Sequence, residues 1–380
     1  MSVLTLPFPS FFTAKQTLCF KGSLGALAAV PSTRHAIIAS PRTQEEPALK
    51  RILAKTRRTH SRCFTPSWTG EPTLPGLKKT LQDIEAFRPD HITAIGGGRI
   101  LDGAKLLWAR YEHPHFPEDR LKLPFSLPKL RQHARFTCVP TTAGTGSESS
   151  STAVYTDHKT GQKIPVVSHE FLPDLAILDP ELLFSLPKKW ICLSGLDALS
   201  HAIEGFVSNQ DNAIANALVV PAITDLFQSL KQLSKKYSLD ALETALRGAN
   251  LAGIIQNLML VGPAHALAHQ LGKTHIPHGL ATGLLLPQVI SHIQSKSKSS
   301  KEKYHYLATT LGFQSQKDWI RAIAELPELF DINPVLSAWP KAKKPSASIG
   351  KKANEDRLAR FFPCSFTNQE LQTLIETIWI

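Results

Sequence analysis

Hydrophobic and polar positions follow two alternating patterns in the first half of the chain. Short β-branched or apolar runs, each followed by Gly, Pro, Ser or Thr, predict strands at His35–Ala39, His91–Ile95 and Arg135–Val139. Apolar residues at helical spacing predict helices over Pro75–Phe87 and Ile100–Tyr111. Strand and helix alternation is typical of a mostly parallel sheet covered by helices, and ligands of such sheets bind at the carboxyl ends of the strands.

The second half has a different pattern, because strand signals fade from about Pro187 onward. The predicted helices there are 191–208, 213–237, 239–260, 262–271 and 279–292. Loop-like tracts, Gln294–Lys303 and Pro340–Lys352, interrupt the later part. We therefore predict an α/β domain over residues 1–186, followed by an all-helical domain over residues 187–380.

Composition narrows the class of protein. The 380 residues are 42% hydrophobic and 19% charged, which excludes a disordered or fibrous chain. No uninterrupted apolar run approaches the roughly 18 residues of a membrane span, and Pro7, Pro9, Lys15 and Lys21 interrupt the apolar amino terminus. The five cysteines are odd in number and widely spaced, as in reduced thiols. We expect a soluble cytoplasmic protein without membrane association.

The net charge of +12 raises the question of nucleic-acid binding. Residues 1–80 hold twelve Lys and Arg against three Asp and Glu, and five more lysines lie between Lys341 and Lys352. Neither cluster has the interleaved aromatic residues, helix or zinc spacing of a nucleic-acid module. We expect a basic surface with weak attraction for anions and no specific nucleic-acid partner.

Two glycine-rich segments each follow a predicted strand. They are GGGRILDGAK at Gly96–Lys105 and PTTAGTGSES at Pro140–Ser149. Glycines allow close approach of a ligand to the backbone, and free amides at the start of a helix can hold a phosphate. Neither segment is a Walker A loop or G-x-G-x-x-G, and two flexible turns are the alternative. Together the two loops favour a polyphosphate ligand.

A third group of polar residues lies in small or apolar segments of the second half. Asp197 and His201 are four residues apart and share one face of a helix, as do His265 and His269. Core histidines satisfied by the protein are one interpretation, since fifteen histidines give such pairs by chance. A divalent cation bound by these residues and His278 is the other, because unpaired buried polar groups cost free energy. One carboxylate with three imidazoles suits ferrous iron or zinc, and the absence of Glu after His265 argues against a zinc protease.

The ordered motifs resemble one family, the iron-containing (group III) alcohol dehydrogenases, especially the alcohol dehydrogenase domain of bifunctional aldehyde-alcohol dehydrogenases. The resemblance covers roughly residues 20–295 well and the rest loosely. The motifs are GEPTL (70–74), AIGGGRILDGAK (94–105), LLWARYEHP (106–114), PTTAGTGSES (140–149), TDHKTGQK (156–163), LDPELL (178–183), GLDALSHAIEG (195–205) and HIPHGLA (275–281).

The resemblance implies a Rossmann-like domain followed by a helical domain, as in dehydroquinate synthase, and a cleft for a nicotinamide cofactor and one divalent metal. It implies that the metal ligands are Asp197, His201, His265 and His278, with iron(II) favoured over zinc. It also implies that His269 helps proton transfer near the substrate. The cofactor-binding positions that it implies are Gly97, Gly98, Arg99, Asp102, Thr141, Thr142, Thr145 and Lys163.

The chain departs from the family pattern at three places. Arg99 stands where the family usually has Ser, and it either adds a phosphate contact or crowds the site. The segment between His269 and His278 is one residue shorter than in similar sequences. NAD-preferring members carry an acid after the second strand, which accepts a hydrogen bond from the ribose hydroxyl of the cofactor. The corresponding stretch here, Ala39 to Arg42, has no acid. We therefore hypothesise that NADP is accepted, and we leave a preference for it open.

The sequence thus predicts a metal-dependent NAD(P)-linked alcohol dehydrogenase or aldehyde reductase. The metal would act as a Lewis acid on the substrate oxygen while a hydride passes to or from nicotinamide. A hydroxy-acid or polyol dehydrogenase of the same family is one alternative. A catalytically silent family member that acts as a binding protein through its basic surface is another. The expected partner is a small alcohol or aldehyde, and a homodimer is left open as the assembly.

Overall fold

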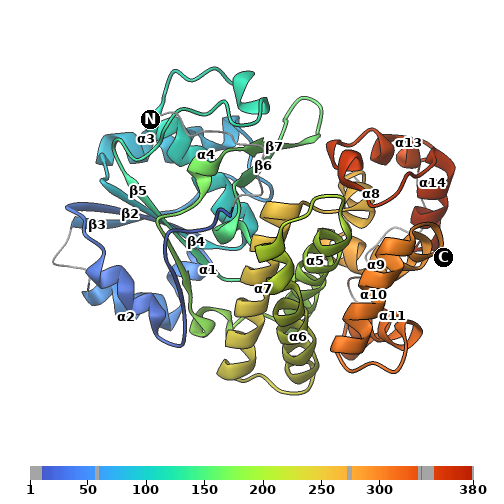
Figure 1. The fold of residues 1–380 in the computed structure, drawn as a ribbon. Helices are drawn as coiled ribbons and strands as arrows, with labels where there is room; N and C mark the ends of the chain where they lie inside the picture. The colour runs from blue at the N-terminus through green and yellow to red at the C-terminus, as the bar shows by residue number, and fades with distance from the viewer. Residues whose placement is uncertain (1–10, 56–59, 272–275, 333–334, 336–345, 379–380) are drawn as a thin grey trace.

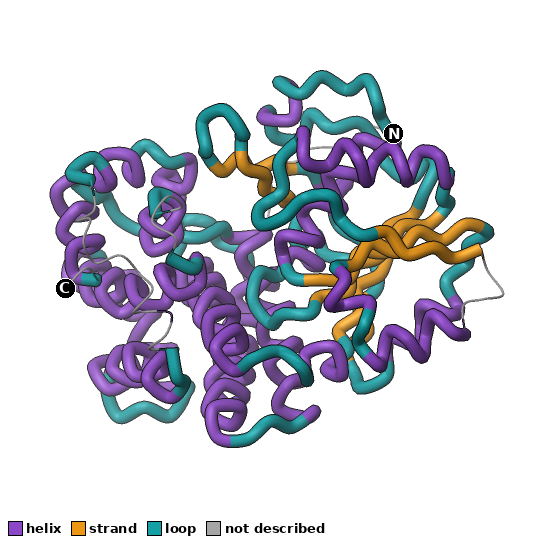
Figure 2. The backbone as a smooth tube through the Cα atoms, turned by 180° about the vertical axis from the view of Figure 1, so that it is seen from behind, coloured by secondary structure: helices purple, strands orange, loops and turns teal. Residues whose placement is uncertain are grey.

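The chain divides into a part that contains a sheet and a part made of helices (Figure 1). The computed structural model describes residues 11–55, 60–271, 276–332, 335 and 346–378. The view from behind shows the strands gathered at one end and helices filling the other (Figure 2). The predicted α/β class with a helical second half is confirmed, and the division at residues 186 and 187 stays a prediction.

A six-stranded parallel sheet with the order β1-β8-β5-β4-β2-β3 organises the first part. Its predicted strands are confirmed as β2 (Arg34–Ala39), β4 (His91–Gly96) and β5 (Arg135–Pro140). The sequence analysis missed the strands β1 (Thr17–Cys19), β3 (His60–Phe64) and β8 (Leu175–Leu178), and the antiparallel hairpin of β6 (Thr152–Thr156) and β7 (Lys163–Val167). β1 and β8 are short, and β3 is an edge strand with mostly polar residues, so their local patterns are weak.

Helices cover both faces of this sheet (Figure 1). The 3₁₀ segment η1 (Ser23–Ala29) and helices α1 (Pro41–Gln44) and α2 (Pro47–Lys55) lie on one side, and α3 (Lys78–Phe87) and α4 (Gly98–Glu112) lie on the other. Successive side chains of a strand point to opposite faces. Ile37 of β2 accordingly belongs to the same apolar cluster as Leu49 of α2, whereas Ile38 belongs to the second cluster together with Leu107 of α4.

After residue 187, the secondary structure of the described residues consists of helices, which are joined by loops. They are α5 (Lys188–Val207), α6 (Ala213–Lys235), α7 (Leu239–Met259), α8 (Pro263–His269), α9 (His278–Lys296), α10 (Lys298–Thr310), α11 (Gln316–Glu325), α13 (Ile349–Asn354) and α14 (Asn368–Thr377). Short 3₁₀ turns occur at η3 (Pro75–Leu77), η4 (Arg120–Lys122), η5 (Ser147–Ser149), η6 (His169–Phe171), η7 (Pro180–Leu183), η9 (Leu326–Leu329) and η10 (Arg357–Phe361).

The five helices predicted for this part are confirmed, but the loop predicted at Gln294–Lys303 is wrong. Helix α9 continues to Lys296, and Ser297 caps α10 by accepting from the Ser300 N–H. The capping side chain and the buried Tyr304 start a new helix within a polar stretch that looks like a loop. The loop predicted at Pro340–Lys352 lies partly outside the described residues, and its end belongs to α13.

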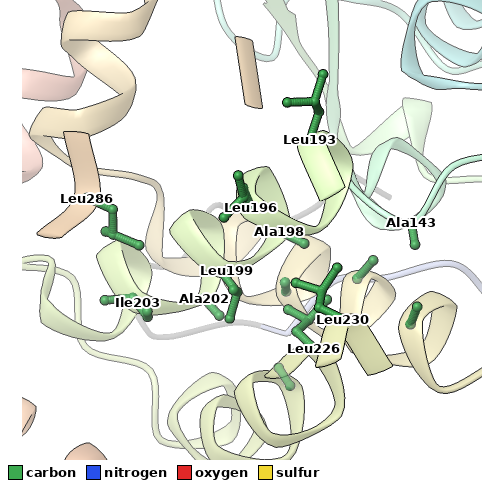
Figure 3. Packing of buried hydrophobic residues seen from close by; sticks show 14 of the residues in the cluster. Ala143, Leu193, Leu196, Ala198, Leu199, Ala202, Ile203, Leu226, Leu230 and Leu286 are labelled. Carbon is green, nitrogen blue, oxygen red and sulfur yellow. The ribbon is translucent and has the colours of Figure 1, made fainter. Parts of the chain in front are cut away.

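Helix α5 is buried on almost all sides (Figure 3). Its Leu196 and Leu199 belong to one apolar cluster with Leu230 of α6 and Leu286 of α9. A helix that is apolar all round is a core helix, so polar residues on it are placed in the interior. Among the described helices, α6 alone is apolar and long enough to cross a membrane. The pair α7 and α8 passes the same test only if the two helices, which are bent by 93°, are counted as one span. The buried side of α6 packs on α5 and α7.

Candidate metal and cofactor site

The two glycine-rich loops lie side by side, because they follow the neighbouring strands β4 and β5. The strands pair up to Gly96 and Pro140, and the Thr141 N–H donates to the Gly96 carbonyl at 3.0 Å. A Cβ on Gly98 would lie 2.7 Å from Cγ2 of Thr145, so only glycine permits this approach. Both loops therefore lie at the carboxyl ends of the strands, where parallel α/β sheets bind ligands.

The first loop also holds the second through side chains. Asp102 accepts from the Ser147 hydroxyl at 2.6 Å and from the Val154 N–H at 3.0 Å. A Cβ on Gly97 would touch the side chain of Thr142 at 3.3 Å. These contacts bring together most of the predicted cofactor-binding residues, and they occupy both carboxylate oxygens of Asp102.

Lys105 is a residue of this region that the sequence analysis did not single out. Its side chain is fully buried, and Nζ donates to the carbonyls of Ser147 at 2.6 Å, Ser150 at 2.9 Å and Thr152 at 3.1 Å. Burial lowers the pKa of this ammonium and raises the pKa of its neighbour Glu148. The lysine therefore fixes the backbone at the end of the second loop and the start of β6 through hydrogen bonds.

The predicted metal ligands converge on one carboxylate oxygen. Asp197 and His201 lie on α5, His265 lies on α8, and His278 is the first residue of α9. The distances from Asp197 Oδ1 to the Nε2 atoms of His265, His278 and His201 are 3.5, 3.6 and 3.9 Å. Asp197, His201 and His265 are buried and form a group compact enough for one ion.

Close packing of helices creates this arrangement. A Cβ on Gly279 would collide with the Leu193 carbonyl, so α9 starts in backbone contact with α5 and brings His278 to Asp197. Glu204, one helical turn beyond His201, accepts from the Ala264 N–H at 2.6 Å and so anchors the start of α8. The same carboxylate accepts from His265 Nδ1 at 2.6 Å.

The donor set fits a divalent cation. Tetrahedral ligands at about 2.1 Å from an ion are about 3.4 Å from one another, which is close to the observed separations. The buried Nε2 of His265 has no hydrogen-bond partner among the described residues, and Glu204 fixes the proton on Nδ1. Nitrogen and oxygen ligands of this kind suit iron(II) or zinc.

The electrostatics of the group follow from burial and from its one carboxylate. Burial lowers the pKa of His201 to about 4, although Asp197 opposes the shift. Burial would also lower the pKa of His265, but the nearby carboxylates of Asp197 and Glu204 raise it to about 9. For Asp197, the surrounding imidazoles overcome the effect of burial and hold the pKa of the carboxyl well below its usual range.

His269, the predicted proton-transfer residue, lies at the solvent-accessible side of the group. Its ring stacks on His278 with 5.6 Å between centroids, and one third of its side chain is exposed. Nδ1 of His269 donates to Asp356 Oδ2 at 3.3 Å. His269 therefore connects the ligand group with a carboxylate from the far end of the chain.

The two predicted cofactor cations lie together at another exposed position. Lys163 Nζ is 3.3 Å from Glu71 Oε1, and Arg99 Nε is 3.6 Å from the same oxygen. Arg42, of the proposed NADP-accepting stretch, is exposed and donates to the Ser185 carbonyl at 2.9 Å. Half of the shortened segment between His269 and His278, residues 272–275, lies outside the described residues.

Four residues of the site were missed by sequence reasoning: Lys105, Glu204, Glu71 and Asp356. The signal for Glu204 is present, because it lies seven residues after Asp197 and hence on the same face of a core helix. Lys105 likewise lies one turn after Asp102. Glu71 and Asp356 have no local signal, since their partners come from distant parts of the chain.

Comparison with known sequences gives matches over both parts. Residues 15–180 match the family described as "Iron-containing alcohol dehydrogenase", and residues 191–379 match "Fe-containing alcohol dehydrogenase family, C-terminal". An NADPH-dependent butanol dehydrogenase from Clostridium saccharobutylicum is 32% identical over 322 residues, which are 81% of each chain. Aldehyde-alcohol dehydrogenase 2 of Entamoeba histolytica is 33% identical over 314 residues, 77% of this chain and 36% of that one.

Solved structures agree with these matches. The iron-containing alcohol dehydrogenase from Thermococcus thioreducens superposes with a TM-score of 0.85 at 27% identity, over 97% of this chain and 99% of that one. The chain spans about a third of the length of its bifunctional relatives, including the Escherichia coli enzyme at 34%.

Proposed function

Because the chain belongs to the family of iron-containing alcohol dehydrogenases, we propose that it is an NAD(P)-dependent enzyme that interconverts small alcohols and aldehydes. The observation that carries the proposal is the convergence of three imidazole Nε2 atoms on Asp197 Oδ1. The group belongs to helices packed against the second glycine-rich loop, since a Cβ on Gly144 would touch Ser194 of α5. A metal position beside a phosphate-holding loop is what metal-assisted hydride transfer requires.

In the proposed mechanism, Asp197, His201, His265 and His278 hold one divalent ion, with iron favoured by the family. The bound ion would supply Lewis-acid stabilisation of charge on the substrate oxygen, and the nicotinamide cofactor would accept or deliver the hydride. Glu204 keeps the proton of His265 on Nδ1, which leaves Nε2 as an electron-pair donor. Gly97 and Gly98 let the first loop pack against Thr142 and Thr145 of the second, and the cofactor pyrophosphate would approach the start of α4 that they form.

His269 carries the proton between the substrate oxygen and solvent in this proposal. Its ring is close to His278 and partly exposed, so it can meet both a substrate beside the ligand group and water. The Asp356 carboxylate accepts from Nδ1 and so orients the ring with Nε2 available for proton exchange.

NADP acceptance is the part of the proposal that concerns cofactor choice. The stretch from Ala39 to Arg42 carries no acid that would repel a 2′-phosphate, and the exposed Arg42 lies in α1, directly after β2. The relative from Clostridium saccharobutylicum is described as NADPH-dependent. Comparing kcat/KM for the two cofactors tests this, and a strong preference for NAD would overturn it.

The central test uses the full chain purified without oxygen. We expect about one divalent ion per chain by elemental analysis and oxidation of NAD(P)H with short aldehydes. His265→Ala should lose both the ion and the turnover. Absence of turnover in the ion-loaded protein, together with salt-sensitive binding of polyanions, would instead favour the silent binding protein. The cytoplasmic location and homodimeric assembly also belong to the proposal, and cell fractionation and the mass in solution test them.

A further inference from the structure

The segment from Ser185 to Ser194 spans the carboxyl ends of three sheet strands. At one end of it, the Arg42 guanidinium, from the helix that follows β2, donates to the Ser185 carbonyl at 2.9 Å. At the other end, a Cβ on Gly144 would lie 2.9 Å from Cα of Ser194, so α5 is in backbone contact with the loop that follows β5. In the sheet, β4 lies between β2 and β5. The segment therefore passes the end of β4, where the first glycine-rich loop begins.

Trp190 lies in the middle of this segment, in the first turn of α5, and is 41% exposed. It precedes Ser194 by one helical turn, so both side chains share the face of α5 that meets the second glycine-rich loop. The other tryptophans that the structure describes, Trp68, Trp108 and Trp319, are buried. Among the described tryptophans, Trp190 is therefore the one whose ring a bound solute can contact.

The surroundings of the ring suit the adenosine half of a dinucleotide. When the pyrophosphate binds at the start of α4 and the ribose lies near the end of β2, the attached adenine is within reach of the segment that contacts both places. Indole rings bind nucleobases by stacking, because both have flat apolar faces. The Lys189 ammonium lies 5.9 Å from the centroid of the Trp190 ring, so positive charge for the phosphates is also close.

We propose that Trp190 is a cofactor-binding residue whose indole ring stacks on the adenine of NAD(P). The inference rests on the proposed dinucleotide-dependent function and assigns a partner to the base. The predicted cofactor-binding residues lie on the two glycine-rich loops, in α4 and at the start of β7, whereas Trp190 belongs to the helical half. The residue contributes affinity for the adenosine half and takes no part in hydride transfer.

The first test measures binding of ADP, which contains the adenosine and pyrophosphate of the cofactor, to the metal-free full chain by calorimetry. Trp190→Ala should weaken binding about tenfold, and Trp190→Phe, which keeps an aromatic face, should stay within about threefold of the wild type. Tyr306→Ala removes an exposed aromatic residue on α10 and is the matched control, with unchanged binding expected. ADP should also quench the tryptophan emission of the wild type, and this change should be absent in Trp190→Phe.

A second test separates a contact with adenine from a general effect on the site. In the iron-loaded enzyme with butanal, Trp190→Ala should lower kcat/KM for NAD(P)H about tenfold. It should leave kcat/KM for reduced nicotinamide mononucleotide unchanged, because that compound lacks the adenosine half. An equal fall with both cofactors would show that Trp190 acts on the fold of the site, and it would overturn the inference.

The two measurements also distinguish this inference from the proposed function. A wild type that binds ADP but reduces no aldehyde would contradict the proposed function, and the ADP affinity of Trp190→Ala would still decide the role of the indole. An active wild type whose ADP affinity does not change in Trp190→Ala would overturn the inference alone. A wild type without measurable ADP binding would overturn it as well.

Discussion

Two buried polar groups, one in each half of the chain, differ in how their atoms are satisfied. Under the glycine-rich loops, the Lys105 ammonium donates to three carbonyls, and Glu148 accepts from Asn250 at 3.0 Å. On the helices, three imidazole Nε2 atoms lie 3.5 to 3.9 Å from Asp197 Oδ1, too far for good hydrogen bonds. Within the part of the chain that the structure describes, His265 Nε2 has no partner.

The difference separates a structural role from a functional one. A buried group that the protein satisfies fully is part of the fold, because its hydrogen bonds offset the free energy of burying it. A buried group whose donor atoms converge without bonding costs free energy until a ligand binds. Burial and polarity alone therefore do not mark a site, whereas convergent unpaired atoms do.

Lys105→Met tests the structural role of the first group and should have the largest effect. The substitution leaves three carbonyls without their donor and removes the ammonium near the buried Glu148, and we expect a loss of about 3–5 kcal/mol in the free energy of unfolding. Urea unfolding followed by circular dichroism measures it. Lys159→Met, at an exposed position between β6 and β7, is the control and should change stability little. A stable Lys105→Met protein would show that the lysine does not hold the loop.

The helical group is tested through Glu204. Glu204→Gln replaces the carboxylate that fixes the His265 tautomer, and we expect metal affinity to fall about 10–100-fold. Competition with a coloured chelator measures the affinity, and the exposed Glu328→Gln should leave it unchanged. Unaltered affinity in Glu204→Gln would mean that the helices alone orient the imidazole.

A pair of buried histidines with unpaired nitrogens provides a third case, because it does not converge on a carboxylate. His35 and His91 bond to Thr93 and Thr137 through Nε2, and no residue placed in the structure bonds to their Nδ1 atoms. Burial lowers the pKa of His35 to about 4. It also lowers the pKa of His91 to about 3, and the charges of His35 and Arg135 add to this shift, whereas Asp174 and Asp90 oppose it. The unfolded chain therefore takes up protons below about pH 6.5 that the folded chain refuses, and stability falls as the pH drops.

We expect His91→Asn to remove part of this pH dependence. Between pH 7 and pH 5, the wild type should lose about 2 kcal/mol more stability than the variant, since each pKa unit corresponds to about 1.4 kcal/mol. Urea unfolding at both pH values measures the difference, and metal content should not change. Equal pH dependence in both proteins would rule out this role for His91.

The smallest expected effect concerns the Asp356 carboxylate on His269. Asp356→Asn should lower kcat about tenfold and leave KM and metal content nearly unchanged, because it weakens the orientation of His269 without touching the ligand group. Steady-state kinetics of the iron-loaded enzyme measure this, with the exposed Asp331→Asn as the matched control. A change confined to KM would place Asp356 in substrate binding instead.

Much of the fold follows from local sequence patterns. The central strands β2, β4 and β5 are recognisable because each is a short, mostly apolar or β-branched run, and the long helices because their apolar residues recur at helical spacing. The strands β1 and β8 are too short for such a pattern, and they form because each pairs with a partner far away in the chain. The polar start of α10 was mistaken for a loop because capping and burial of Tyr304 outweigh local composition.

The candidate site was predictable to a similar extent. The glycines and histidines are informative because their types and spacing are unusual within apolar segments, and the structure brings the predicted ligands together. The residues that support them were not predictable in this way. Asp356 and Glu71 are ordinary surface residue types, and only the fold shows what they contact.

The pairing of β1 with β8 has a consequence for biosynthesis. β1 is made before every other strand of the sheet, yet the strand beside which it lies, Leu175–Leu178, leaves the ribosome after all of them. β8 also joins β1 to β5, so the nascent sheet keeps an open edge at β5 until then. Chaperone dependence during synthesis should accordingly end once residue 178 has emerged, well before the helical half is complete.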